Sequence, residues 1–238
     1  MDGWKWFDRF VLFKSIKASE IEKQQTANRI IQAVEIERSR ISRELHDSIG
    51  QALYSVLIGV KIVSQLKVDE SVREHFLQVE NLTAKALEEV KRISHDLHPS
   101  TLDDLGLIPS IRVYLGQFEY TFGIRTKFNH CDNFRRYNKD TEIALYRICQ
   151  EALTNAAKYA QTPEVEVSFL EETTSVRLII QDFGQGFQVK QYDDNAKTEG
   201  IGLISIRERA NSLGGKALIH SQPDKGTSVE VTIPIKNM

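Results

Sequence analysis

The sequence contains few cysteines and carries almost no net charge. Its two cysteines, Cys131 and Cys149, lack a CxxC spacing, which argues against a disulfide scaffold or a zinc site and suits a reducing, cytoplasmic compartment. The 31 basic side chains nearly balance the 33 acidic ones and leave a net charge of -2. We therefore expect no direct binding of nucleic acid, and any nucleotide must be held by a local site.

Long apolar runs are also absent. No stretch reaches the roughly 18 uncharged apolar residues of a membrane span, and the first residues lack the pattern of a signal peptide. Residues 1–13 mix charged side chains with aromatic ones, which are Trp4, Trp6, Phe7, Phe10 and Phe13. Such a segment can lie at a membrane surface, end a sensor region, or pack on a second subunit. We interpret residues 1–26 as an N-terminal signal-input segment and leave these alternatives open.

The hydrophobic pattern changes near Leu102, and the chain is long enough for two domains with a core each. We expect a first domain at residues 27–101 and a second at residues 102–238. Heptad spacing from Gln24 to about Val63 predicts a long helix with a dimer seam. The columns of this seam are Ile31, Leu45 and Ala52 on one side, and Ala27, Val34 and Ile41 on the other.

At ~1.5 Å per residue this helix would be ~60 Å long, so its apolar face needs a second helix and a second chain. A turn near residues 67–71 and a second helix that stops at Pro99 would complete a hairpin. The apolar face of the second helix consists of Val79, Thr83, Ala86, Val90, Ile93 and Leu97. Two such hairpins would form the four-helix bundle of a homodimer.

Beyond Pro99, helical and strand patterns are mixed. We expect helices at residues 108–122, 141–160 and 203–213, and strands at residues 124–129, 164–170, 176–182, 216–222 and 227–234. The last strands follow each other too closely for helical crossovers, so an antiparallel or mixed sheet is favoured over a doubly wound one. The predicted fold class is therefore α+β.

Three residues of the helix expected at 141–160 are candidates for holding a charged ligand. Glu151 and Asn155 lie four residues apart and Lys158 lies three further on, so all three share one helix face. The oxygen ligands of Glu151 and Asn155 suit Mg²⁺, and a lysine beside them neutralises further phosphate charge. Taken alone, the pattern is more typical of an ordinary solvated helix face.

Two glycine-rich segments change that interpretation. Asp182 ends an apolar strand, and Gly184 and Gly186 after it let the backbone approach a ring or a phosphate closely. Gly200 and Gly202 stand at a helix start, where free N–H groups and the helix dipole favour phosphate. Between the two segments, residues 188–199 are polar and lack periodicity, as expected of a lid over a bound nucleotide.

The run 44–51 places His46, Asp47 and Gln51 in a strongly helical stretch. An imidazole with a pKa of about 6.5 is largely neutral at cell pH and therefore nucleophilic, and Asp47 is the candidate acceptor for its proton. Asp47 and Gln51 are one turn apart, so both can lean over the same point. Gly50 either clears room for an approaching loop or allows close helix packing. The alternative for His46 is a surface histidine of a coiled coil.

A second histidine-aspartate pair, His95-Asp96, does not continue in the same way. The position four residues after Asp96 is Ser100 rather than glutamine, and Pro99 ends the helix there. We interpret this pair as a structural hinge, with residues 101–107 linking the two domains.

The four segments 44–51, 151–155, 182–186 and 200–203, in this order, resemble the two-component sensor histidine kinases. The resemblance covers roughly residues 27–235 and points to the subfamily whose response regulators carry a receiver domain and a LuxR-type DNA-binding domain. It implies a two-layer α/β sandwich of the GHKL ATPase type, with ATP and Mg²⁺ as cofactors. It also implies that His46 is phosphorylated from ATP and passes the phosphoryl group to an aspartate of the regulator.

The same resemblance assigns roles to single residues. Asp47 would act as the general base, and Gln51 would position the water that dephosphorylates the regulator. Asp182 would bind the adenine amino group, and Thr227 would lie near the adenine, although a simple turn before a strand explains Thr227 equally well. The chain departs from the family at Tyr159, where a histidine is usual, which puts a minor contact in doubt.

Two other classes of protein remain as alternatives. A GHKL ATPase that uses ATP as a clamp would hydrolyse ATP rapidly without forming phosphohistidine, and it would not share the segment around His46. A non-catalytic dimeric adaptor would bind a regulator without phosphotransfer. The intact Glu151, Asn155 and Asp182, together with the four glycines, argue against such decay.

Overall fold

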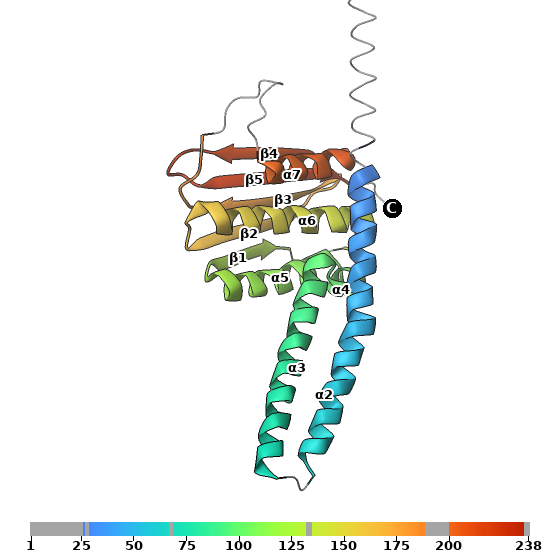
Figure 1. Ribbon diagram of the computed structural model, residues 1–238. Coiled ribbons are helices and arrows are strands. Elements are labelled where there is room, and N and C mark those ends of the chain that lie inside the picture. The colour runs from blue at the N-terminus through green and yellow to red at the C-terminus, as the bar shows by residue number, and fades with distance from the viewer. Residues whose placement is uncertain (1–25, 27–28, 67–68, 132–134, 189–199, 236–238) are drawn as a thin grey trace, which may run out of the picture. The chain divides into compact units, whose positions relative to one another are not determined.

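The computed structural model describes residues 26, 29–66, 69–131, 135–188 and 200–235 (Figure 1). The chain forms two compact units. One is Gln32–Ser100, and the other contains the described residues from Thr101 onward together with the described residues before Gln32. The domain limits 27–101 and 102–238 stay a prediction. The aromatic residues 1–13, the seam residue Ala27 and all of the expected lid except Gln188 lie outside the described residues.

The unit Gln32–Ser100 is a helical hairpin, as the sequence predicts. Its first arm is α-helical over residues 32–44, π-helical in η1 (Leu45–Gly50), and α-helical again in α2 (Gln51–Ser64). Its second arm is α3 (Glu70–Leu97). His98, directly before Pro99, is extended with φ -160° and ψ 110°, so the helix ends where the proline requires it to end.

The heptad pattern of the first arm does not run unbroken. A π-helix has more residues per turn than an α-helix, so η1 shifts the phase of the residues that follow it. Val34 and Ala52 of the predicted seam are exposed, whereas Ile31, Ile41 and Leu45 are half-buried. Only the column that runs from Leu45 to Ala52 crosses η1, so the heptad spacing of that column changes there. The dimer seam itself stays a prediction.

The second unit contains one five-stranded sheet in the order β1-β2-β3-β5-β4. Strand β1 runs parallel to β2 and all other pairs are antiparallel, so the sheet is mixed, as predicted. The strands are β1 (Arg125–His130), β2 (Glu164–Glu171), β3 (Ser175–Asp182), β4 (Lys216–Ser221) and β5 (Thr227–Pro234).

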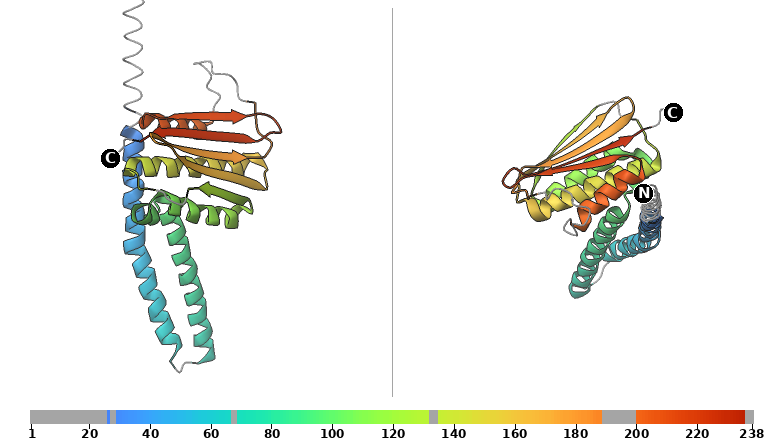
Figure 2. Two further views of the ribbon diagram at one scale, coloured as in Figure 1. Left: turned by 180° about the vertical axis from the view of Figure 1, so that it is seen from behind. Right: turned by 90° about the horizontal axis from the view of Figure 1, so that it is seen from above.

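Three helices cover one face of this sheet (Figure 2). They are α5 (Leu107–Phe122), α6 (Lys139–Asn155) and α7 (Ile201–Ser212). Burial alternates along β3 and β5. Every second residue, such as Leu178 and Val231, points into the core, and the residues between them are less buried. The result is a two-layer α/β sandwich, which confirms the α+β class.

Residues 101–107 are anchored to the second unit through Leu102 and Leu107 and are not a free link. Leu102, in α4 (Ser100–Leu105), and Leu107 are 3% and 2% exposed. The Arg136 guanidinium donates hydrogen bonds to the carbonyl oxygens of Leu102 and Asp103 and pairs with the buried Glu142 carboxylate at 2.9 Å. The sequence could not show this anchor, because Arg136 lies more than thirty residues further along the chain.

Over the described ranges, no helix has both the length and the apolar character that crossing a membrane requires.

Candidate functional site

His46 lies in the π-helix η1 with its side chain exposed, and Asp47 beside it is exposed as well. Single π-helical turns inside α-helices are often found at functional sites. Within the described chain, no hydrogen bond engages either ring nitrogen of His46, so the imidazole is open to a reaction partner.

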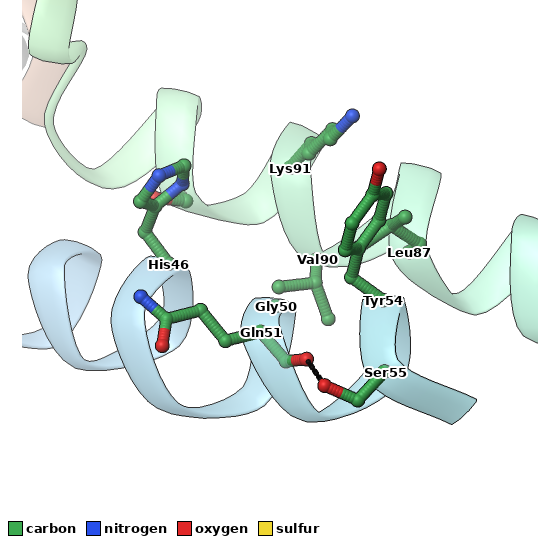
Figure 3. A pocket seen from close by; sticks show the side chains of 9 residues that line it. His46, Gly50, Gln51, Tyr54, Ser55, Leu87, Val90 and Lys91 are labelled. Carbon is green, nitrogen blue, oxygen red and sulfur yellow. Dashed lines mark hydrogen bonds between the residues drawn. The ribbon is translucent and has the colours of Figure 1, made fainter. Parts of the chain in front are cut away.

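A hollow of about 420 Å³ begins at His46 and runs between the two arms of the hairpin (Figure 3). Its lining residues are His46, Gly50, Gln51, Tyr54, Ser55, Leu87, Val90, Lys91 and Ser94. The hollow therefore brings His46 and Gln51 together. Asp47 is not among its lining residues.

Gly50 is not required for close helix packing. A Cβ atom built there would meet only the carbonyl oxygen of Leu45, at 3.4 Å, which is an ordinary van der Waals contact. Its φ of -61° and ψ of -45° are those of any helical residue. Because Gly50 has no side chain, it leaves open space beside His46.

A buried polar clasp joins the two arms one turn before His46. The Ser42 hydroxyl is 2.9 Å from the carbonyl oxygens of both Ser94 and His98, and the Ser94 hydroxyl reaches the Ser42 carbonyl oxygen at 3.0 Å. The two hydroxyl oxygens are 2.8 Å apart. Ser42 and Ser94 are 5% and 8% exposed, so these bonds form away from water. Sequence periodicity gave no signal for this contact, because it joins residues 52 positions apart.

The second histidine-aspartate pair has a different setting. His95 is half-buried on α3, and the Asp96 carboxylate forms an ion pair with Arg92 at 3.1 Å. Neither residue lines the hollow.

In the second unit, Glu151 and Asn155 of α6 meet the N-terminus of α7. A Cβ atom at Gly202 would lie 2.0 Å from Oε1 of Glu151 and 3.1 Å from Nδ2 of Asn155. Only a glycine leaves these two polar side chains where they are. The first N–H groups of α7, which have no partner within the helix, therefore open next to the carboxylate and the amide.

Lys158 belongs to a second π-helical segment, η2 (Ala156–Ala160), and is exposed. The predicted single helix over residues 141–160 thus consists of α6 followed by η2. The chain has α-helical spacing only as far as Asn155, so the prediction that Lys158 shares a helix face with Glu151 and Asn155 does not follow from that spacing. Among the residues that the structure describes, no hydrogen bond or ion pair joins Lys158 to Glu151 or Asn155.

Asp182, at the end of β3, organises the second glycine segment. Its carboxylate is 6% exposed, and Oδ1 accepts hydrogen bonds from the backbone N–H groups of Gly184 and Thr227, at 3.0 and 3.2 Å. In the part of the chain that the structure describes, Oδ2 has no protein donor. One oxygen thus fixes the carboxylate, and the other can accept a bond from a ligand.

The loop after Asp182 is held by approaches that only glycine allows. A Cβ atom at Gly184 would be 1.9 Å from the Ala160 carbonyl oxygen, and one at Gly226 would be 2.1 Å from the Asp182 carbonyl oxygen. Gly186 has a φ of 57°, in the left-handed region that favours glycine. These contacts join the end of η2, the end of β3 and the start of β5.

Sequence reasoning missed two residues of this junction. The Ser221 hydroxyl contacts Phe187 N at 2.8 Å, the Gly226 carbonyl oxygen at 3.1 Å and Oγ1 of Thr227 at 3.0 Å. The Gln185 side chain donates to the Tyr159 carbonyl oxygen at 2.5 Å. Ser221 lies opposite Thr227 in the register of β4 and β5, a pairing that the sequence does not reveal.

The residues present suit a nucleotide with Mg²⁺ better than a metal held by protein alone. Among the described residues, no group of three His, Cys, Asp or Glu could hold a metal ion. Glu151 and Asn155 offer one carboxylate and one amide oxygen, and Mg²⁺ commonly takes one or two protein ligands and completes its shell with phosphate and water.

Two family models match the chain. Residues 37–102 match "Histidine kinase", and residues 140–237 match "Histidine kinase-, DNA gyrase B-, and HSP90-like ATPase". The first range contains His46, Asp47 and Gln51, and the second contains every residue predicted to bind the nucleotide.

Similar proteins include two curated kinases. The chain is 38% identical over 218 residues to the signal transduction histidine-protein kinase/phosphatase DegS of Brevibacillus brevis, and 35% identical over 213 residues to the oxygen sensor histidine kinase NreB of Staphylococcus carnosus (strain TM300). Each match covers 90% of this chain, but only 55% of DegS and 60% of NreB. The chain thus spans little more than half the length of these relatives.

Among solved structures, the histidine kinase domain of the blue-light activated histidine kinase from Erythrobacter litoralis EL346 matches with a TM-score of 0.49 and 16% identity. That match covers 78% of this chain and 94% of the other.

Proposed function

Since this chain belongs to the sensor histidine kinases of the subfamily that includes DegS and NreB, we propose that it transfers the γ-phosphoryl group of ATP to His46 and then to an aspartate of a response regulator. The observation that carries this proposal is the exposed His46 in a π-helical turn, in one chain with an ATPase domain. Both cysteines are free thiols, which suits a cytoplasmic enzyme.

The nucleotide site supports this proposal by its chemistry. The second oxygen of Asp182 would accept a hydrogen bond from the adenine amino group, with Gly184, Gly186 and Thr227 shaping the wall around it. The N–H groups at Gly200 and Gly202 would bind phosphate oxygens. Glu151 and Asn155 would hold Mg²⁺, which neutralises phosphate charge when bound, and Lys158 would add a positive charge.

At the phosphoacceptor site, a neutral ring nitrogen of His46 would attack the γ-phosphorus as the bond to the leaving ADP oxygen breaks. The imidazole then loses the proton on its other nitrogen, and Asp47 would take it. The phosphoryl group would then be transferred to a carboxylate oxygen of the regulator. As the new P–O bond forms, the P–N bond to His46 breaks and its electron pair returns to the imidazole nitrogen.

The same surface would also dephosphorylate the regulator. Gln51 lies in the hollow with His46, and its amide can hold a water molecule over the phosphoaspartate. Asp47 is one turn away on the same arm. We therefore propose a bifunctional enzyme, with Asp47 and Gln51 serving the phosphatase reaction.

The assembly that we propose is a homodimer built from two hairpins as a four-helix bundle. Its partner would be a response regulator with a receiver domain and a LuxR-type DNA-binding domain, and the chain itself would not bind nucleic acid. Residues 1–26 would receive the signal, through attachment to a sensor region or a membrane surface.

Incubation of the purified chain with Mg²⁺ and γ-labelled ATP tests this function. We expect a label that is lost in acid and stable in alkali, absent from His46→Gln and from Asn155→Asp, and retained in His75→Gln, which changes an exposed histidine outside the hollow. Label that survives in His46→Gln would move the site to His95 or His98. Rapid ATP hydrolysis without any label would instead indicate an ATP-driven clamp.

A further inference from the structure

The segment of chain that joins the hairpin to the second unit is held at both of its ends. On the hairpin side, the His98 carbonyl oxygen lies 2.9 Å from the hydroxyl of the buried Ser42. On the other side, the Leu102 carbonyl oxygen accepts a hydrogen bond from the Arg136 guanidinium at 3.3 Å. Only residues 99–101 lie between these two carbonyl groups, and the first of them is a proline, whose φ is restricted.

Arg136 holds the last turn of α4 as a whole. Its guanidinium also donates to the Asp103 carbonyl oxygen at 3.2 Å and lies 3.5 Å from that of Asp104. The last carbonyl groups of a helix have no partner within it, so one guanidinium at this end can satisfy several of them. The same guanidinium pairs with Glu142 at 2.9 Å, and the Glu142 side chain is 3% exposed. Arg136 therefore ties α4 to a buried carboxylate of α6.

Two further contacts strengthen this anchor. The Lys139 ammonium forms an ion pair with the Asp103 carboxylate at 2.9 Å. A Cβ atom at Gly106 would lie 2.7 Å from Cδ of Arg136, and Gly106 has a φ of 87°, in the region that favours glycine. The backbone that follows α4 thus packs directly on the arginine side chain.

The anchor lies far from the predicted nucleotide contacts. Glu142 is in the first turn of α6, whereas Asn155 is the last residue of that helix. At ~1.5 Å per residue, the two are ~20 Å apart along the helix axis. Any effect of Arg136 on the reaction would therefore act through the joining segment and not through contact with bound ATP.

We propose that Arg136 is a positioning residue for phosphoryl transfer to His46. By fastening α4 to the second unit, it confines the pivot between the two units to residues 99–101. The inference rests on the proposed function, in which the γ-phosphorus must come within about 3–3.5 Å of a ring nitrogen of His46. The effective concentration of two groups joined by a flexible link falls roughly as the −3/2 power of the length of that link. A short link therefore keeps the ATP-binding unit concentrated around His46.

The test measures the autophosphorylation rate of the full chain against ATP concentration. Arg136→Lys keeps a positive charge for Glu142 but lacks the planar fork that reaches several carbonyl oxygens. A second variant carries the insertion Gly-Ser-Gly-Ser-Gly after Ser100, which lengthens the link and leaves Arg136 in place. The matched control is Arg135→Lys, because Arg135 is the neighbouring residue and pairs instead with Glu171, at 2.8 Å.

We expect the insertion to lower the rate at saturating ATP by about fourfold, because the free link grows from residues 99–101 to about eight residues. Arg136→Lys should lower it by roughly two- to fourfold, since the buried Leu102 remains as an apolar anchor. The half-saturating ATP concentration should stay at the wild-type value in both variants. Hydrogen exchange of residues 101–106 should become faster in Arg136→Lys, while that of β3 and β5 does not change. Arg135→Lys should behave like the wild type.

Other results would overturn the inference while leaving the proposed function in place. A wild-type rate in either variant would show that the anchored link does not position the ATP-binding unit. A higher rate would show that the anchor restrains the reaction instead. A raised half-saturating ATP concentration in Arg136→Lys, with faster exchange across the sheet, would make Arg136 a structural residue of the second unit alone. A wild-type chain that forms no label would instead refute the proposed function.

Discussion

Gly200 and Gly202 have equivalent places in the GxG sequence, but the structure separates them. A Cβ atom at Gly202 would meet Glu151 and Asn155, whereas at Gly200 nothing lies within 4 Å. The atom in the way at Gly202 is the end of a flexible glutamate side chain, so it can move aside at little cost to the fold. We therefore expect Gly202→Ala to weaken Mg²⁺-ATP binding by about tenfold or more, with a small change in melting temperature.

Gly200→Ala is the matched control for this prediction, and its loss of affinity should be much smaller. Titration with a fluorescent ATP analogue gives the affinities, and a thermal melt of each variant gives the stability. Equal losses in the two variants would show that displacement of Glu151 is not the cause.

Some residues of the nucleotide site could be found from the sequence and others could not. Asp182 could be found because it ends an apolar strand and precedes glycines. Ser221 and Gln185 could not be found, because each acts through contacts with segments distant in the chain: Ser221 with Phe187, and Gln185 with Tyr159. Sequence spacing reports neighbours within one element only.

The clasp between Ser42 and Ser94 carries a prediction at the scale of elements, because it joins the two arms beside His46. Removing either hydroxyl breaks hydrogen bonds that form away from water between the two arms, which costs about 1–2 kcal/mol. We expect Ser42→Ala and Ser94→Ala each to speed hydrogen exchange of residues 38–46 and 90–98 by roughly 5–30-fold. The double variant should lose less stability than the sum of the losses in the two single variants, because the two hydroxyls share hydrogen bonds.

Ser55→Ala serves as the control for the clasp. The Ser55 hydroxyl is exposed and bonds only within its own helix, to the Gln51 carbonyl oxygen at 2.9 Å. Its removal should leave exchange near the wild-type rate. Additive losses in the double variant would mean that the two serines act independently.

The regular elements of the second unit were predicted to within about two residues, apart from the end of α6 and the unpredicted α4. Strand β5 matches residues 227–234 because Val229, Val231 and Ile233 alternate strictly with polar residues. The π-helices η1 and η2 could not be predicted in this way. Their residue types are ordinary for a helix, and a π turn arises from packing around it rather than from periodicity.

At the scale of the whole molecule, the hairpin exposes more apolar surface than an isolated helical pair should. Val56 is 50% exposed and Val79 is 42% exposed, and both lie outside the hollow beside His46, on surface that we expect a second copy of the chain to cover. Burial of such surface drives association, whereas a carboxylate placed in the seam would be desolvated without a partner. We therefore expect Val56→Glu to dissociate the dimer.

Ile58 provides the matched comparison, because it is 42% exposed on the same helix and two residues away, which is roughly 200° around the axis. Ile58→Glu should remain dimeric. Light scattering coupled to size-exclusion chromatography, over a dilution series, distinguishes the two masses. If Val56→Glu stays dimeric while Ile58→Glu dissociates, the seam lies on the other face of the helix, where a second copy would cover the hollow beside His46.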